Sequence, residues 1–127
     1  MSAHLTIPAS PGEVADKLSI LDLKAERIMD AARVANVLVE RDALRLAWAE
    51  AGLPPYDSLP EWPELVAVNG ALWDVEDALR QHEAQGDFGA EFVALARSVY
   101  RHNDHRAALK RRMNLSLGSR LIEEKSF

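Results

Sequence analysis

The chain has 127 residues, of which 48% are hydrophobic and 28% charged, a composition that fits one globular domain and excludes a disordered protein. It contains no cysteine, which excludes disulfides, thiolate metal sites and cysteine nucleophiles. The net charge of −5 is unevenly divided, because residues 1–96 carry 7 Lys/Arg against 17 Asp/Glu and residues 97–127 carry 8 against 3. This division predicts that the C-terminal segment meets an acidic surface, within the chain or on a second subunit.

The location of the protein is predicted from two absences in the sequence. No stretch approaches the roughly 20 apolar residues that a membrane span requires. The N-terminal sequence MSAHLTIPASPGE lacks the basic start and the apolar run of a signal peptide. We therefore expect a cytoplasmic protein that makes no membrane contact.

The first predicted element is a long helix over residues 11–51. Ser10 can cap it, Pro11 suits its first position and Glu13 closes a capping box. No proline or glycine interrupts the chain from Glu13 until Gly52. Apolar residues recur at alternating steps of four and three along this stretch, which predicts a seam that faces partner helices. The members of this seam are Val14, Leu18, Leu21, Ala25, Ile28, Ala32, Ala35 and Val39.

Two further helices follow a proline-rich loop at 52–63. The second helix is predicted over residues 63–85 and the third over 88–117, each with its own apolar seam and with Gly86 or Gly118 at its end. The whole chain is therefore predicted to be all-α, a single-domain antiparallel hairpin or three-helix bundle with one long N-terminal helix. The long helix outreaches its partners, so we expect a homodimer that covers the leftover apolar stripe.

A polar line runs beside the apolar seam of each predicted helix. Residues at these spacings share one helix face, so the three lines can converge on one site. Such a site, rich in lysine, arginine and amides, suits a small anion, a carboxylate or a phosphate. The candidate ligand-binding residues are Lys17, Lys24, Arg27, Asn69, Trp73, Glu76, Tyr100, Asn103, Arg106, Lys110 and Asn114.

Simpler interpretations of the same residues stay open. Amphipathic helices commonly carry lysine, arginine and glutamate on their solvent side, and interhelical ion pairs account for such lines as well. Asn103 and Asn114 favour a more specific role, because asparagine is a mediocre helix former whose amide seeks hydrogen bonds.

Other chemistry finds little support in the sequence. His102 and His105 lie one helical turn apart, yet the Glu-x-x-His pairs of helical metal sites are missing, so we expect no metal and no cofactor. No nucleophile elbow or glycine-rich phosphate loop occurs. The basic run LKRRMN has no interleaved aromatic residues, so nucleic-acid binding is the least favoured alternative.

Three segments together resemble a family of small bacterial helical proteins of unknown function. They are SPGEVADKLSILDLKAERI, NGALWDVEDALR and DFGAEFVALARSVYRHNDHRAALKRRMNLSLGSRLIEEKSF, so the resemblance covers residues 7–127 apart from the loop. It implies no activity, cofactor or partner. The positions that carry it are Glu13, Asp16, Lys17, Lys24, Ile28, Asn69, Trp73, Glu76, Tyr100, Asn103, Asp104, Arg106, Lys110, Asn114 and the closing EEKSF.

The sequence thus leaves three functional hypotheses. The first is a binding or accessory module that recognises a protein partner or a small anionic ligand through the Lys/Arg/Asn face. The second is a small helical enzyme whose cationic pocket stabilises an anionic metabolite during its reaction. The third is a nucleic-acid-binding module.

Overall fold

The structure, a computed structural model that describes residues 3–127, is built from α-helices joined by short connections. The prediction of an all-α protein is confirmed. Within the described residues the helices are α1 (Pro11–Arg27), α2 (Ala31–Glu50), α3 (Trp62–Gln85) and α4 (Ala90–Ser116), with a single 3₁₀ turn, η1 (Tyr56–Ser58). The predicted helices at 63–85 and 88–117 match α3 and α4 to within two residues.

The predicted long helix over 11–51 is wrong, because the chain leaves the helical conformation at Ile28. Ile28 is extended, with φ −76° and ψ 131°, and Met29 is 93% exposed. Asp30 then begins a new helix, since its side chain accepts a hydrogen bond from the backbone N–H of Arg33 at 3.0 Å. The first two helices therefore form a hairpin, and the three-helix bundle becomes a four-helix structure.

The break also changes which side chains of the second helix are buried. Val37 and Trp48 face the core, whereas Ala32, Ala35 and Val39, which continue the apolar seam of the first helix, are exposed. A helix that restarts after a three-residue interruption has no reason to keep the rotational phase of the helix before it.

We predict that Asp30→Ala destabilises the protein by about 1 kcal/mol, because it removes the capping acceptor of α2. Thermal unfolding followed by circular dichroism measures the loss. Asp30→Asn keeps a side-chain acceptor and is the matched control, expected to lose only a few tenths of a kcal/mol. Equal losses in the two variants would mean that the cap does not hold the start of α2.

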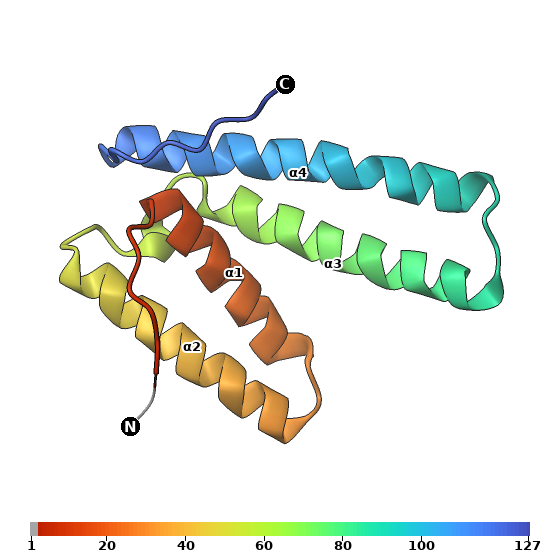
Figure 1. Ribbon diagram of the computed structural model, residues 1–127, viewed down its shortest axis with the longest axis horizontal. Coiled ribbons are helices and arrows are strands. Elements are labelled where there is room, and N and C mark those ends of the chain that lie inside the picture. The colour runs from red at the N-terminus through yellow and green to blue at the C-terminus, as the bar shows by residue number, and fades with distance from the viewer. Residues whose placement is uncertain (1–2) are drawn as a thin grey trace.

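The two helical hairpins meet at one end and diverge from it, as Figure 1 shows. α1 lies between α2 on one side and the α3–α4 hairpin on the other. The core lies where the N-terminal half of α1 meets the start of α3 and the end of α4. Its buried apolar members are Ala15, Trp48, Leu59, Leu65, Val68, Leu109 and Met113.

The proline-rich loop at 52–63 closes this end of the core. Trp48 donates its indole N–H to the carbonyl of Pro54 at 2.8 Å, and its ring contacts Tyr56 edge-on. Tyr56 in turn packs against Trp62, with ring centroids 5.1 Å apart. The loop is therefore a packed part of the fold rather than a solvated linker.

Candidate functional site

The centre of the polar face is an ion pair between α1 and α4. Asp16 is fully buried, and Arg106 binds both of its carboxylate oxygens, with 2.8 Å from Nε to Oδ1 and a second contact from Nη2 to Oδ2. These hydrogen bonds raise the pKa of Arg106 above its ordinary value, against the opposing effect of its burial. The arrangement is the bidentate fork that makes arginine the usual partner of a buried carboxylate.

Asn69 and Ser19 complete the network around Asp16. The Asn69 side-chain amide donates to Asp16 Oδ1 at 3.0 Å and to Ser19 Oγ at 2.6 Å. Ser19 donates its hydroxyl hydrogen to the Asp16 backbone carbonyl at 2.9 Å. All three side chains are buried, so the network joins α1, α3 and α4 with its buried polar groups satisfied.

A second buried contact fixes the end of α4 against the start of α1. Asn114 is 2% exposed, and its Oδ1 accepts a hydrogen bond from the backbone N–H of Gly12 at 2.7 Å. That N–H belongs to the first turn of α1, where backbone donors have no partner inside the helix. A Cβ on Gly12 would lie 2.5 Å from the backbone oxygen of Lys110, so only glycine allows the two helices to approach this closely.

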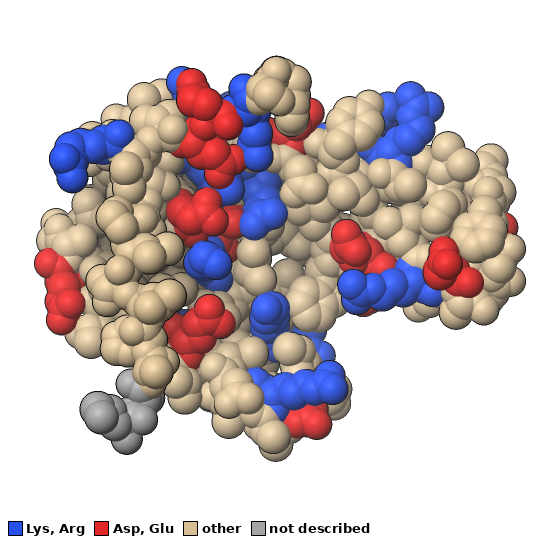
Figure 2. All heavy atoms as spheres, in the orientation of Figure 1, with Lys and Arg blue, Asp and Glu red and all other residues tan. Residues whose placement is uncertain are grey.

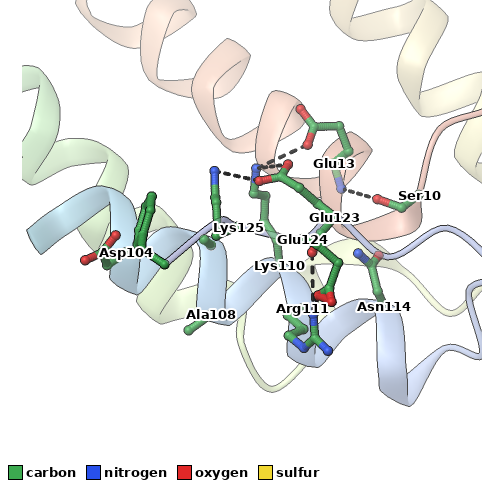
Figure 3. A pocket seen from close by; sticks show the side chains of 12 residues that line it. Ser10, Glu13, Asp104, Ala108, Lys110, Arg111, Asn114, Glu123, Glu124 and Lys125 are labelled. Atoms are coloured by element: carbon green, nitrogen blue, oxygen red, sulfur yellow. Dashed lines mark hydrogen bonds and ion pairs between the residues drawn. The ribbon is translucent and has the colours of Figure 1, made fainter. Parts of the chain in front are cut away.

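Lys110 links the network to the C-terminal tail, residues 118–127. Its Nζ lies 3.1 Å from Glu13 Oε2 and 3.6 Å from Glu123 Oε2. Arg111 binds the carboxylate of Glu124, and Lys125 lies 2.7 Å from Glu123. Figure 3 shows these charged side chains lying between the tail, α1 and α4.

The tail covers a hollow of about 490 Å³ between the start of α1 and the last turns of α4. Its charged lining balances closely, with three cations and four carboxylates. They are Lys110, Arg111 and Lys125, and Glu13, Asp104, Glu123 and Glu124. The hollow is therefore not a purely cationic pocket, and all three of its cations already hold carboxylates of the chain itself.

The structure brings five of the eleven predicted site residues together and leaves the rest apart. Four of the five bind the N-terminal half of α1 directly: Asn69, Arg106, Lys110 and Asn114. The fifth, Asn103, accepts a hydrogen bond from Arg106. Arg27 lies near the other end of α1, 2.5 Å from Asp74 and 5.8 Å above the ring of Trp73. Glu76 contacts Arg80 of its own helix, and Tyr100 is 54% exposed.

Lys17 and Lys24 differ from the other predicted cations. Arg27, Arg106 and Lys110 each lie against a carboxylate, whereas neither α1 lysine forms an ion pair with any residue of the stretch 3–127. Lys17 is exposed and follows Glu13 by one helical turn, so it lies beside the Glu13–Lys110 pair. These two lysines are the free positive charges of α1.

The acidic partners were the part of this site that the sequence analysis did not assign. Asp16 appeared there only among positions that carry the family resemblance. Its position next to Ala15, and three residues before Ser19, places a carboxylate and a hydroxyl near an apolar seam, which is a usable signal of a buried polar network. Nothing in the spacing of Glu123 and Glu124 indicates that the tail folds back onto α4.

One of the two neighbouring histidines of α4, His105, makes an ordinary surface contact. His105 Nε2 lies 3.1 Å from Glu64 Oε2 of α3. No group of three or more metal-ligating side chains occurs among residues 3–127.

In the part of the chain that is described, every helix is too short or too polar to cross a membrane. Comparison of the chain with family models, curated proteins and solved structures found no match. The resemblance to the bacterial helical family therefore stays a prediction.

Proposed function

We propose that this protein is a binding module that recognises an acidic segment of a partner protein at the face of α1 and the end of α4 on which the tail lies. One observation carries the proposal: this face already holds two neighbouring carboxylates, Glu123 and Glu124 of the chain's own tail, through Lys110 and Arg111. A partner segment that carries neighbouring carboxylates offers the same ion pairs.

The attachment of the tail is weak enough to be exchanged. Beyond Leu121, the contacts that hold it to α4 come mainly from charged side chains, and Glu123 and Glu124 are both exposed. Ion pairs of this kind contribute about 0–1 kcal/mol each. A partner with comparable charges can therefore compete with the tail.

The tail attachment also depends on pH. A hydrogen bond from Lys125 and the charge of Lys110 lower the pKa of Glu123 from its ordinary 4.5. A carboxylate with a lowered pKa stabilises its contacts above its ordinary pKa, and this contribution is lost as the pH falls through the lowered value. The contribution of the Glu123–Lys110 contact to tail attachment is therefore present at neutral pH and lost in acid.

An acidic segment fits the hollow better than a small free anion does. When the tail leaves, Glu123 and Glu124 leave with it, while Glu13 and Asp104 stay beside Lys110 and Arg111. A replacement therefore needs spaced carboxylates rather than one concentrated charge. Lys17 and Lys24 extend the positive surface along α1 toward such a segment.

The two other hypotheses have less support from the geometry. An enzyme with a cationic pocket needs a free guanidinium, but two of the three guanidinium nitrogens of Arg106 donate to Asp16 and the third donates to Asn103. For nucleic acid, two of the three cations of the run at 110–112 are engaged with carboxylates, and only Arg112 is not.

We predict that Glu123→Gln/Glu124→Gln tightens the binding of a fluorescein-labelled oligoglutamate peptide by roughly three- to tenfold. The ion pairs that hold the tail contribute about 0.5–1.5 kcal/mol, and the peptide no longer has to displace them. Fluorescence anisotropy at moderate salt measures the affinity. Lys110→Gln is expected to weaken the same binding, provided that its thermal unfolding shows a folded protein.

The matched control is Asp77→Asn/Glu83→Gln, which removes two exposed negative charges from α3. It changes the net charge equally, so any gain there measures non-specific attraction. Equal gains in the two double variants, or no binding by any of them, would overturn the proposed function.

A further inference from the structure

α2 carries a second apolar stripe on the side opposite the core. The residues of this stripe follow one another at steps of three and four, so they share one helix face. Val39 is 72% exposed and Leu46 is 60% exposed. The stripe, which we call the α2 outer face, consists of Ala32, Ala35, Val39, Ala43 and Leu46, all exposed. A helix of an isolated monomer seldom leaves its apolar side in water in this way.

Three exposed carboxylates flank the α2 outer face, together with one exposed cation, Arg33, at the start of the helix. Glu40, Asp42 and Glu50 are exposed, and they form no ion pair with any residue between 3 and 127. Two cations of the same helix are directed to α1, because Arg41 and Arg45 lie 3.2 and 3.6 Å from Asp22. The α2 outer face also borders a groove of about 1140 Å³ along the N-terminal segment, residues 4–10.

α4 presents an outer face with a net positive charge, on which Asp104 also lies by its position in the helix. Val93, Tyr100 and Leu115 are large apolar or aromatic side chains that are 49%, 54% and 61% exposed. The same helix face, which we call the α4 outer face, carries Arg97, Arg101 and Arg112, which are exposed and form no ion pair within the described chain. Figure 2 shows basic and acidic side chains along the edge of the molecule where α4 and the tail lie.

We propose that copies of this chain associate through the α2 outer face of one copy and the α4 outer face of the next. The charges are complementary, and their spacing agrees: Glu40 and Glu50 are about 15 Å apart along α2, and Arg101 and Arg112 about 16 Å apart along α4. Packing α2 against a second α2 would instead bring like charges together.

The position of the two faces determines the kind of assembly. α2 and α4 bound opposite sides of the molecule (Figure 1), so a copy that binds through α2 still exposes its own α4. The contact is therefore heterologous and joins copies head to tail. It also gives the uneven charge of the chain a role, because the basic C-terminal helix meets an acidic surface on a second subunit.

Charge reversal tests the proposal by analytical ultracentrifugation. Wild-type protein is expected to show association that grows with concentration and weakens with salt. Glu40→Arg/Glu50→Arg alone and Arg101→Glu/Arg112→Glu alone are each expected to be monomeric, because each variant has two faces of the same sign. An equimolar mixture of the two variants is expected to associate again, since each face then finds an oppositely charged one.

Asp77→Arg/Glu83→Arg on α3 is the matched control, expected to associate like the wild type. A wild-type chain that stays monomeric at every concentration would overturn the proposal, and so would a mixture that stays monomeric. Retained association in either reversal variant would also overturn it. If the wild type is monomeric yet binds a basic amphipathic peptide that Glu40→Arg/Glu50→Arg does not bind, the occupant of α2 is a partner helix instead.

Discussion

Asp16→Asn is expected to destabilise the protein by about 3 kcal/mol, because it leaves the guanidinium of Arg106 without its buried counter-charge. Breaking a buried ion pair by removing one partner costs about 3–5 kcal/mol. We expect the lower end of that range, since the side chain of Arg106 is 27% exposed and can reach water. Urea unfolding followed by circular dichroism measures the free energy of unfolding.

The matched variant is the double replacement Asp16→Leu/Arg106→Met. It removes both charges together, so it is expected to cost less than Asp16→Asn alone. A loss below about 1 kcal/mol in Asp16→Asn, or a double variant less stable than the single one, would show that the pair does not hold α1 against α4.

Gly12→Ala is expected to destabilise the protein by about 2 kcal/mol, because the added methyl group has no room. Its Cβ would lie 2.5 Å from the backbone oxygen of Lys110 and 2.9 Å from Oδ1 of Asn114. Relief of the clash moves α1 away from α4 and strains the hydrogen bond from Gly12 to Asn114. Overpacking of this kind costs about 1–3 kcal/mol. The midpoint of urea unfolding measures the loss.

Gly70→Ala in α3 is the matched control and has the opposite expected sign. Its nearest foreign atom would be the Nη2 of Arg27 at 3.9 Å, which is ordinary contact. Alanine in a helix interior is favoured over glycine by about 1 kcal/mol, so this variant is expected to gain stability. Similar losses in both variants would mean that the close helix crossing at Gly12 does not set the effect of Gly12→Ala.

The local signals in the sequence predicted the helices well and the connections less well. Ser10 and Pro11 start α1 as predicted, and Gly86 ends α3 in the left-handed conformation with φ 66°. The break at Ile28–Asp30 was missed because it contains neither glycine nor proline. In the sequence, the capping residue Asp30 cannot be distinguished from an aspartate on the exposed side of a continuous helix.

The polar face shows the same division between what was predictable and what was not. Periodicity placed Arg106, Lys110 and Asn114 on one side of a helix, and that side does face α1. Periodicity gave no information on the groups they meet, which are Asp16, Glu13 and the backbone of Gly12. These partners lie about 100 residues away in the chain. The distance from each α4 side chain to its partner on α1 depends on how the two helices cross.

The sequence by itself determined that this protein is all-α, where two of its helices, α3 and α4, begin and end, and which side chains share a face. These properties follow from capping residues and from the 3.6-residue period, both of which act over one or two turns. Only the tertiary structure decided that Arg106 is neutralised, that the tail lies on Lys110 and Arg111, and that the apolar stripe of α2 faces outward. Those outcomes depend on the rotation and crossing of whole helices, which are set by packing between distant segments and not by any local pattern.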